Sequence, residues 1–391
     1  MSKKKIVILG STGSIGKTTY KIISKDKKTF EIKLLTTNTN YKLIIDQAKR
    51  MNVKNIIITD KKNYLIAKKK YKNRKIKIYN SFKEIKKIFK KKIDYTMCAI
   101  SGLEGLEPTL DIIKYSKRIA IANKESIICG WNLIKNQLTK YKTQFIPVDS
   151  EHFSIYQLIK NHNKKNIKRI IITASGGPFL NKKINNVSLT DALKHPNWKM
   201  GQKISIDSAT LMNKVFEVIE AKKIFNINLK KIKILINPNS YFHSIIIFNN
   251  GTIKILAHEN KMEIPIHNSI YVNNTKYYYS TQDLNLTKIN NLNLSKPNTK
   301  FFTTLNLLKL IPDKDSLFET ILVSVNDELV KLFLNKQIEY KNLLYYLNKI
   351  INFKKFKKYC NVRPKSIKDI ININHQTKKI VHEIIYKKKF F

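Results

Sequence analysis

Short apolar runs alternate with stretches of helical periodicity over residues 1–148. Charged and polar positions separate the runs, and apolar positions recur every three to four residues at 14–24 and 103–116. Such alternation predicts parallel strands joined by helices, which gives a doubly wound, Rossmann-like α/β sheet. Six runs are typical of buried strands: 5–10, 31–37, 55–59, 94–100, 118–122 and 143–148.

The pattern changes after residue 167. A strand and turn are predicted at IKRIIITASGG, a helix at 209–225, and strands at 232–236, 243–248 and 251–257. Asn249-Asn250-Gly251 joins the last two strands and is a hairpin signal. We therefore predict a first domain at 1–148, followed by three further segments: a central α+β domain at 149–272, a weakly patterned linker at 273–312 and a small helical domain at 313–391.

Composition leaves two classes of function open, a nucleic-acid-binding protein and an enzyme. The chain has 75 Lys and Arg against 27 Asp and Glu, a formal charge of +48, and 42% hydrophobic residues. A basic chain is often a nucleic-acid binder, but these lysines are spread along the whole sequence. An enzyme whose surface has drifted towards lysine is the favoured interpretation. We expect weak binding of polyanions and no specific nucleic-acid partner.

Other features of the sequence suggest a compartment. No apolar run approaches the ~20 residues of a membrane span, no secretory signal peptide is visible, and the three cysteines form no CxxC pair. We therefore expect a cytoplasmic protein of bacterial type that does not bind a membrane.

A glycine-rich loop, GSTGSIG at 10–16, follows the first predicted strand and opens a helix. Its glycines would let the backbone approach a pyrophosphate at the helix N-terminus, although a plain strand-to-helix turn is the alternative. The end of the second predicted strand, 35–42, has no acidic residue to bind the ribose hydroxyls of NAD. This favours NADP over NAD.

Two acids, Asp149 and Glu151, follow the apolar run 145–148. If the strand continues, both point to one side and could bind a hard divalent ion such as Mg²⁺ or Mn²⁺. An acid/base pair and an ordinary exposed strand end are the alternatives.

The segment 195–221 contains few lysines. His195-Pro-Asn-Trp198 is typical of a lid, and Asp207-Ser208 is predicted to cap the next helix, which would place Ser208 at a phosphate site. Asn213, Lys214 and Glu217 share a helix face. They could bind an anionic, metal-bound ligand or simply form a surface ion pair.

Two further turns follow predicted strands. A Ser-Gly-Gly turn begins at Ser175 and could form a backbone nest for an anion, or be only a tight turn. Lys124 follows the fifth strand and could stabilise a developing negative charge.

These motifs together resemble the 1-deoxy-D-xylulose 5-phosphate reductoisomerase family. The resemblance rests on order and spacing over nearly the whole chain, in six segments: GSTGSIG at 10–16, ANKES at 122–126, PVDSEH at 147–152, SGGPF at 175–179, the stretch 195–217 and NPNSYFHS at 237–244. It implies conversion of 1-deoxy-D-xylulose 5-phosphate to 2-C-methyl-D-erythritol 4-phosphate by skeletal rearrangement and reduction. The implied cofactors are NADPH and a divalent metal, Mg²⁺ or Mn²⁺, with Co²⁺ as a further candidate. A homodimer is expected by the same analogy.

The resemblance also implies residue roles. Asp149, Glu151 and Glu217 would bind the metal, and Lys124, Glu151, His195 and His243 would be catalytic. The substrate would contact Lys124, Ser150, Glu151, Ser175, His195, Trp198, Ser208, Asn213, Lys214 and Glu217. The cofactor would contact Thr12, Gly13, Ser14, Ile15, Asn40, Asn123, Glu125, Gly201 and Met262.

Three departures from the family pattern concern the cofactor and lid. Of the usual Ala-Gly-Lys-Asn after the second strand only Asn40 is kept, Met262 lies in a changed local sequence, and Gln202 replaces a usual arginine. A metal-assisted dehydrogenase without isomerisation and a basic nucleic-acid-binding protein are the alternative functions.

Overall fold

The structure is a computed structural model of the 391-residue chain. It describes residues 2–72, 75–180, 187–198, 200–272, 286–290 and 293–387. The chain forms two compact units, which we describe separately. The first contains Met1–Ser126, Leu133–Phe153 and Met262–Ser280, and the second contains Ile127–Asn132, Ser154–Lys261 and Thr281–Phe391. The division into four sequence segments remains a prediction.

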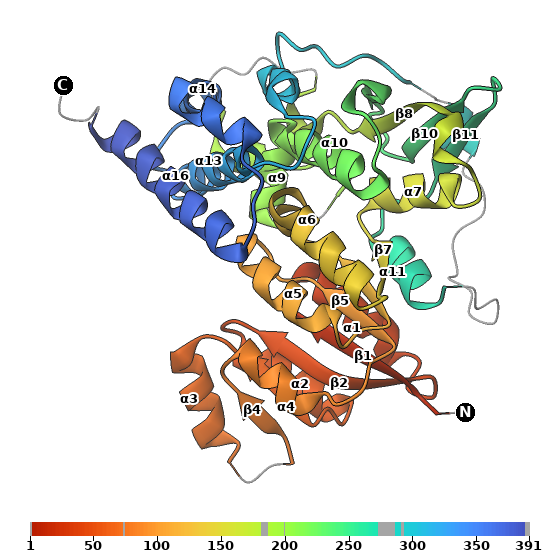
Figure 1. The fold of residues 1–391 in the computed structure, drawn as a ribbon, viewed down its shortest axis with the longest axis vertical. Coiled ribbons are helices and arrows are strands. Elements are labelled where there is room, and N and C mark those ends of the chain that lie inside the picture. Colours follow the sequence, from red (N-terminus) through yellow and green to blue (C-terminus); the bar gives the residue numbers. More distant parts are fainter. Residues whose placement is uncertain are drawn as a thin grey trace. The chain divides into compact units, whose positions relative to one another are not determined.

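A seven-stranded parallel sheet forms the centre of the first unit (Figure 1), in the order β4-β3-β2-β1-β5-β6-β7. Ile6–Leu9 in β1 are fully buried, as expected for a parallel sheet covered on both faces. The strands are β1 (Lys4–Leu9), β2 (Phe30–Thr37), β3 (Asn55–Ile58), β4 (Lys77–Tyr79), β5 (Tyr95–Cys98), β6 (Arg118–Ile121) and β7 (Gln144–Pro147).

Helices flank this sheet, so the predicted Rossmann-like fold is confirmed. They are α1 (Ser14–Ser24), α2 (Tyr41–Arg50), α3 (Lys61–Lys70), α4 (Ile85–Ile88), α5 (Leu106–Ile113) and α6 (Lys124–Lys140), with 3₁₀ turns η1 (Phe82–Glu84) and η2 (Leu103–Gly105). A late helix, α11 (Glu263–Ile270), returns to this core, where the Tyr95 hydroxyl lies 2.7 Å from that of Ser269. The chain reverses its direction across the sheet between β1 and β5, which is where open α/β sheets bind ligands.

The second unit is built on a mixed four-stranded sheet in the order β11-β10-β8-β9. Its strands are β8 (Ile167–Ala174), β9 (Ile232–Ile236), β10 (Phe242–Phe248) and β11 (Ile253–Ala257). The predicted hairpin is confirmed, since β10 pairs antiparallel with β11 and Gly251 has a φ of 85°. Apolar residues of this sheet, including Ile170 and Ile246, pack against helix α10 (Met212–Phe225), which contributes Val218.

Helices make up the rest of the second unit and include the predicted helical C-terminal region. They are α8 (Leu189–Leu193), α9 (Gln202–Ala209), α12 (Leu286–Asn290), α13 (Leu317–Leu334), α14 (Tyr340–Ile351), α15 (Lys354–Lys357) and α16 (Ile367–Lys387), with η3 (Lys164–Asn166), η4 (Gly177–Phe179), η5 (Leu229–Lys231), η6 (Thr303–Leu310) and η7 (Lys358–Asn361). Helices α13 and α16 run side by side (Figure 1).

A buried charge cluster joins α10 to α13. The Lys223 ammonium lies 2.7 Å from the Glu319 carboxylate and 2.5 Å from that of Asp315, and Lys222 lies 3.9 Å from Glu319. Glu319 is fully buried and also accepts the Ser316 backbone N–H at 3.1 Å. This cluster therefore fixes the start of α13 against the last turn of α10.

The structure differs from two local predictions and describes only part of the segment in a third. Asp149 and Glu151 are not on a continued strand, because helix α7 (Ser150–Ile159) begins immediately after Asp149; the chain passes from the first unit to the second within this helix. Asp207 and Ser208 lie in the last turn of α9 and do not cap the next helix. Within the predicted linker, 273–285 and 291–292 lie outside the described residues, whereas Ser295 forms a bridge with Ile236.

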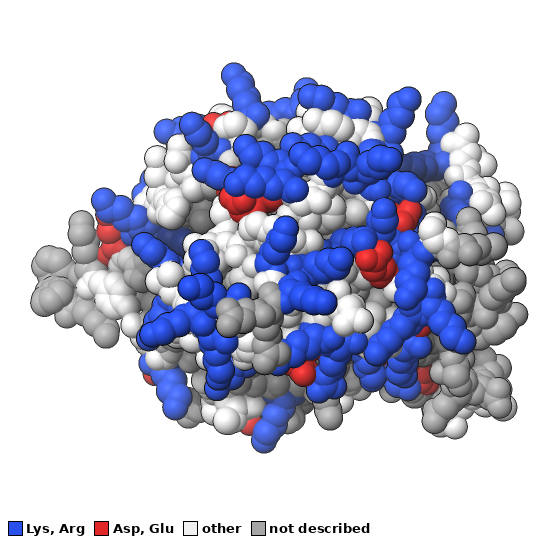
Figure 2. Space-filling view, turned by 90° about the horizontal axis from the view of Figure 1, so that it is seen from below, with Lys and Arg blue, Asp and Glu red and all other residues white. Residues whose placement is uncertain are grey.

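Lysine and arginine dominate the face shown in Figure 2, where acidic residues are few. This agrees with the formal charge of +48. Among the described residues, we find no helix long and apolar enough to cross a bilayer.

Candidate active site

The glycine loop lies at the carboxyl end of β1, beside the switch point of the first unit. Gly10 has a φ of +79°, and a Cβ atom there would lie 2.6 Å from the Ala99 carbonyl oxygen. No side chain caps α1 at Gly13, and its first turn contains no acid. The backbone N–H groups of this turn, which starts at Ser14 and Ile15, can therefore donate to an anion.

The end of β2 contacts this loop. The Thr12 and Thr37 hydroxyls lie 2.7 Å apart, and the Gly10 N–H donates to the Thr36 hydroxyl at 2.8 Å. Asn40 caps α2 by accepting the Leu43 N–H at 3.2 Å. The segment thus offers hydroxyl and amide groups without a carboxylate.

Asn123 fixes the turn after β6. Its side-chain oxygen accepts the Ser126 N–H at 2.6 Å, and its amide donates to the carbonyls of Ile100 and Gly102 after β5. These bonds hold the start of α6, where Lys124 and the buried Glu125 lie in the first turn.

The two acids lie at the N-terminus of α7. The carboxylate of Asp149 accepts the Glu151 N–H at 3.3 Å, and one carboxylate oxygen of each residue lies within 4.8 Å of the other. Ser150 donates its hydroxyl to Glu151, and the Lys124 ammonium forms an ion pair with Asp149. Two carboxylates, a hydroxyl and an ammonium therefore meet here.

Burial opposes ionisation of Asp149, but Lys124 and His152 outweigh this effect and hold the pKa of its carboxyl well below 3.8. His152 is 1% exposed, and its Nδ1 lies 3.2 Å from Asp149 Oδ1. Sequence reasoning left His152 without a role. The i, i+3 spacing from Asp149 was the available signal, and it becomes informative only on a helix.

A third carboxylate, Glu217, is presented by α10 in the second unit. Glu217 is 1% exposed, and its two oxygens accept from the Asn213 amide and the Lys214 ammonium. The shared helix face predicted for these three residues is thus confirmed. Because Lys214 is only 4% exposed, the pair is buried rather than a surface ion pair.

Ser175 and His195 form a second polar group in this unit. The Nδ1 atom of His195 accepts the N–H groups of Asn197 at 3.1 Å and Trp198 at 2.9 Å. In the neutral ring the proton is therefore on Nε2, which lies 3.0 Å from the Ser175 hydroxyl oxygen. That oxygen also accepts the Gly177 N–H at 3.1 Å, which leaves the Ser175 O–H to donate elsewhere.

The pKa of His195 is lowered to about 4. Burial is the main cause, and the positive charge of Lys214 lowers this pKa further. His195 is thus neutral at physiological pH.

Gly177, at a φ of +67°, lets its turn approach α9 closely, because a Cβ atom there would lie 2.6 Å from the Ser208 carbonyl oxygen. These contacts bring Ser175, His195, Lys214 and Ser208 into one region of the second unit.

The predicted lid segment packs against the stretch before β10. The Asn197 amide donates to the carbonyl of Pro238 at 2.5 Å and to the Ser240 hydroxyl at 3.0 Å. The rings of Trp198 and His243 lie 6.2 Å apart, and His243 stacks on His258 at 3.7 Å.

The two remaining cofactor candidates have different surroundings. Met262, in the first unit, packs against the apolar core that contains Ile266 and Ile270. Gly201, in the second unit, precedes α9 and has no atom within 4 Å of a Cβ placed on it. Packing therefore gives no reason for a glycine at 201.

The fold and these groups define a class. A Rossmann-like sheet with an open glycine loop, together with buried carboxylates and ammonium groups, is typical of a dinucleotide-dependent enzyme. Three family models match the chain: 1-deoxy-D-xylulose 5-phosphate reductoisomerase at residues 6–130, the reductoisomerase C-terminal domain at 145–225, and a further DXP reductoisomerase C-terminal domain at 259–380. The chain belongs to the 1-deoxy-D-xylulose 5-phosphate reductoisomerase family.

Individual relatives agree. A 1-deoxy-D-xylulose 5-phosphate reductoisomerase of Pelagibacter ubique (strain HTCC1062) is 57% identical over 376 residues, covering 95% of this chain and 97% of the relative. The one from Wolbachia pipientis wMel is 36% identical over 394 residues, with 98% of each covered.

Solved structures of the family have the same fold. The reductoisomerase of Zymomonas mobilis in complex with NADPH has a TM-score of 0.87 at 30% identity, covering 98% of this chain and 99% of that one. A reductoisomerase in complex with NADPH, fosmidomycin and magnesium has a TM-score of 0.90 at 28% identity, with 99% of each covered.

Proposed function

We propose that the chain converts 1-deoxy-D-xylulose 5-phosphate to 2-C-methyl-D-erythritol 4-phosphate, using NADPH and a divalent metal. The observation that carries this proposal is the buried α10 face. Glu217, Lys214 and Asn213 contact one another there, and Ser175 and His195 lie in the same region. A carboxylate next to an ammonium, an amide and a hydroxyl suits a ligand that carries both a metal and a phosphate.

Asp149, Glu151 and Glu217 are the proposed metal ligands. The donor set fits a hard cation because all three offer carboxylate oxygens, with those of Asp149 and Glu151 within 4.8 Å of one another. The very low pKa of Asp149 keeps that ligand ionised. Mg²⁺ or Mn²⁺ is proposed, with Co²⁺ as a further candidate, and the bound ion would supply Lewis-acid chemistry at substrate oxygens.

Ser175, Ser208, Asn213 and Lys214 are proposed to bind the substrate phosphate. Ser175 suits this role because its oxygen accepts from His195 and Gly177, which directs its own proton outward. Lys214 supplies the positive charge, and neutral His195 orients Ser175 without adding a charge.

The remaining contacts concern the reacting carbons. Lys124 and Ser150, which contact Asp149 and Glu151, are proposed to bind substrate oxygens. Glu151 would move a hydroxyl proton. His195 and Trp198 would close over the substrate, and buried His243, next to Trp198, would hold this segment in place.

NADPH would supply the hydride, and its proposed contacts are those predicted from the sequence. Thr12, Gly13, Ser14 and Ile15 belong to the glycine loop and the first turn of α1, whose N–H groups no side chain caps. The other proposed contacts are Asn40, Asn123, Glu125, Gly201 and Met262. A homodimer in a bacterial cytoplasm is proposed by family analogy.

A direct assay tests the function: NADPH oxidation in the presence of 1-deoxy-D-xylulose 5-phosphate, with and without Mg²⁺ or Mn²⁺. Turnover that needs the metal and yields the branched product is expected. Reduction to an unbranched product would support the dehydrogenase alternative, and turnover unaffected by removal of the metal would contradict the metal site.

Glu217→Gln tests the third ligand. We expect a loss of at least 100-fold in turnover, because the carboxylate charge is removed while the side-chain shape stays, and unchanged NADPH binding. Mn²⁺ binding should weaken as well. Glu328→Gln is the matched control. Glu328, on α13, is also a buried carboxylate, and it pairs with His382 of α16 at 2.8 Å. Its loss should leave kcat nearly unchanged. Loss of NADPH binding in Glu217→Gln would indicate a folding role.

A further inference from the structure

The turn between α9 and α10 carries most of the residues proposed to bind the substrate phosphate. Ser208 lies in the last turn of α9, and Asn213 and Lys214 lie in the first turn of α10. Between them Leu211 has a φ of +57°, a left-handed conformation that is costly for leucine. Such a residue persists only where the surrounding structure holds its backbone in place. The turn therefore depends on support from other parts of the fold.

The helical C-terminal region supplies this support through buried hydroxyl groups. The Tyr340 hydroxyl, at the start of α14, donates to the Ala209 carbonyl at 2.9 Å, and the Thr304 hydroxyl of η6 donates to the Thr210 carbonyl at 2.6 Å. Both donor residues are at most 2% exposed. Because carbonyl groups at the end of a helix lack helical partners, these two hydrogen bonds fix the backbone that follows Ser208.

Tyr340 also contacts the second of the proposed phosphate-binding turns. Its ring meets that of Phe179 edge-on, with centroids 5.4 Å apart, and Phe179 ends η4, the short helix that follows Ser175. The two turns approach each other closely at Gly177 and the Ser208 carbonyl. A single side chain of the C-terminal region thus contacts both turns, one through its ring and the other through its hydroxyl.

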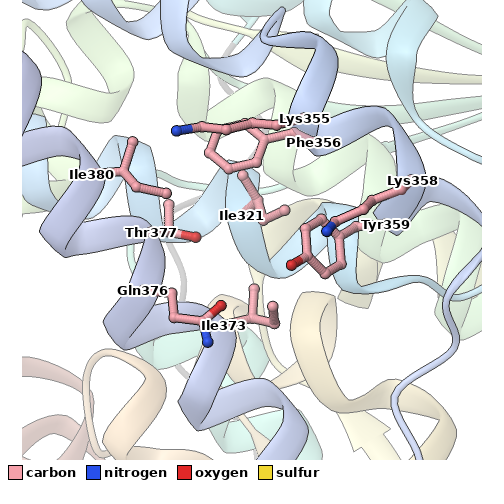
Figure 3. A pocket seen from close by; sticks show the side chains of 9 residues that line it. All are labelled: Ile321, Lys355, Phe356, Lys358, Tyr359, Ile373, Gln376, Thr377 and Ile380. Carbon is pink, nitrogen blue, oxygen red and sulfur yellow. The ribbon is translucent and has the colours of Figure 1, made fainter.

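Helix α13 connects the α9–α10 turn to the other C-terminal helices. Its Asn326 amide donates to Asp207 at 2.8 Å. Ile321, five residues earlier and therefore on a different side of the helix, lines a small cavity of about 90 Å³ together with Phe356 of α15 and Ile373 of α16 (Figure 3). Packing around this cavity can be changed without removing any of the hydrogen-bond donors to the turn.

We propose that Tyr340 is a positioning residue for the substrate phosphate. Several donors bind one phosphate group well only when their spacing is fixed, and Tyr340 fixes the spacing of Ser208 and Ser175. Thr304 and Asn326 secure the same turn. The helical C-terminal region thereby controls substrate affinity, although none of its residues is a proposed substrate contact. The inference rests on the proposed function, in particular on the phosphate-binding residues.

Steady-state kinetics of the full chain tests this role. Tyr340→Phe keeps the ring and removes the hydroxyl. We expect the KM for 1-deoxy-D-xylulose 5-phosphate to rise at least fivefold, with kcat changed less than twofold and the KM for NADPH unchanged. Inorganic phosphate, used as a competitive inhibitor, should bind at least threefold more weakly. A merely structural loss would reduce the amount of active protein, and with it the apparent kcat, but not KM. An unchanged substrate KM in this variant overturns the proposal.

Two further variants separate this effect from general destabilisation. Tyr95→Phe removes another fully buried tyrosine hydroxyl, which lies 2.7 Å from that of Ser269 in the first unit. Ile373→Val loosens the packing around the cavity beside α13. Both should lower Tm and leave the substrate KM unchanged. A rise in KM equal to that of Tyr340→Phe in either variant indicates general loosening and overturns the proposal.

Thr304 allows a rescue experiment. Thr304→Val should raise the substrate KM, because it removes the second hydroxyl donor to the turn at similar side-chain shape. Thr304→Ser, which keeps the hydroxyl, should restore KM to within twofold of its original value. A rise in KM that is equal in the two variants would contradict a role for the hydrogen bond.

The coupling to Ser208 shows whether Tyr340 acts through the turn. In a Ser208→Ala background, Tyr340→Phe should raise KM by less than half as much, since the group that it positions is gone; full additivity overturns the proposal. Lys214→Met separates this inference from the phosphate site. A large rise in KM there, with none in Tyr340→Phe, refutes the positioning role alone, whereas an unchanged KM in both refutes the phosphate site as well.

Discussion

His195 shows how one side chain acquires a defined protonation state. Two backbone N–H groups fix its tautomer, burial and the charge of Lys214 keep it neutral, and its remaining N–H orients Ser175. A protonated ring would place a second positive charge next to Lys214.

The titration of His195 is the first prediction at this scale. Its folded pKa of about 4 lies below the ordinary 6.5, so its contribution to stability is complete above pH 6.5 and is lost as the pH falls through about 4. The imidazole NMR signal, assigned by its absence in His195→Asn, should titrate near pH 4. In Lys214→Met the midpoint should rise only in part, because burial is the larger cause. A midpoint near 6.5 in the unmodified chain would contradict this prediction.

Helical spacing allowed several residue contacts to be predicted from the sequence. Asn213, Lys214 and Glu217 were placed on one face because i, i+3 and i, i+4 positions meet on any helix. His152 was missed because its contact with Asp149 requires a helix at 150–159, whereas the apolar run before it predicted a continued strand.

At the scale of elements, one backbone conformation explains the main error in the central motif. Leu211 has a φ of +57° and separates α9 from α10. A left-handed leucine has no sequence signal, since glycine or asparagine is usual there. The sequence therefore predicted a single helix after Ser208, whereas Ser208 lies in the last turn of α9. Asp207, predicted to be a cap, instead accepts from the Asn326 amide of α13 at 2.8 Å.

The buried cluster around Glu319 gives a prediction for the joint between α10 and α13. Glu319→Gln removes the carboxylate that lies near both Lys222 and Lys223 and leaves Asp315 as the partner of Lys223. We expect the free energy of unfolding to fall by about 1–3 kcal/mol, because Lys223 keeps its ion pair with Asp315 but loses the charge-assisted hydrogen bond to Glu319. Denaturant unfolding measures this.

An exposed pair serves as the control for that variant. Glu339 and Lys341 lie 3.1 Å apart with side chains 68% and 74% exposed, so Glu339→Gln should change stability little. Similar losses in the two variants would show that burial of the Glu319 cluster is not the cause.

For the whole molecule, the most prominent physical property is its large positive charge. The fold class was predicted correctly, because strand–helix alternation is a local pattern that a lysine-rich surface does not disturb. The return of α11 to the first unit was harder to predict, because contacts such as that of Tyr95 with Ser269 join residues far apart in the chain.

The formal charge of +48 predicts a salt-dependent stability. Self-repulsion of the folded chain weakens as ions screen it, so Tm should rise between low and moderate NaCl concentrations. Differential scanning calorimetry measures this, and KCl at the same ionic strength should give the same rise. A constant or falling Tm would contradict the prediction.

The discontinuity of the first unit has a consequence for synthesis. All seven strands have been translated once Pro147 is made, but the core that they share with α11 lacks Ile266, Ile270 and Tyr271 until more than a hundred further residues have been added. At the usual speed of a ribosome this takes on the order of ten seconds. During that interval the nascent sheet exposes an apolar surface, which a chaperone would have to shield before the chain's own helix arrives.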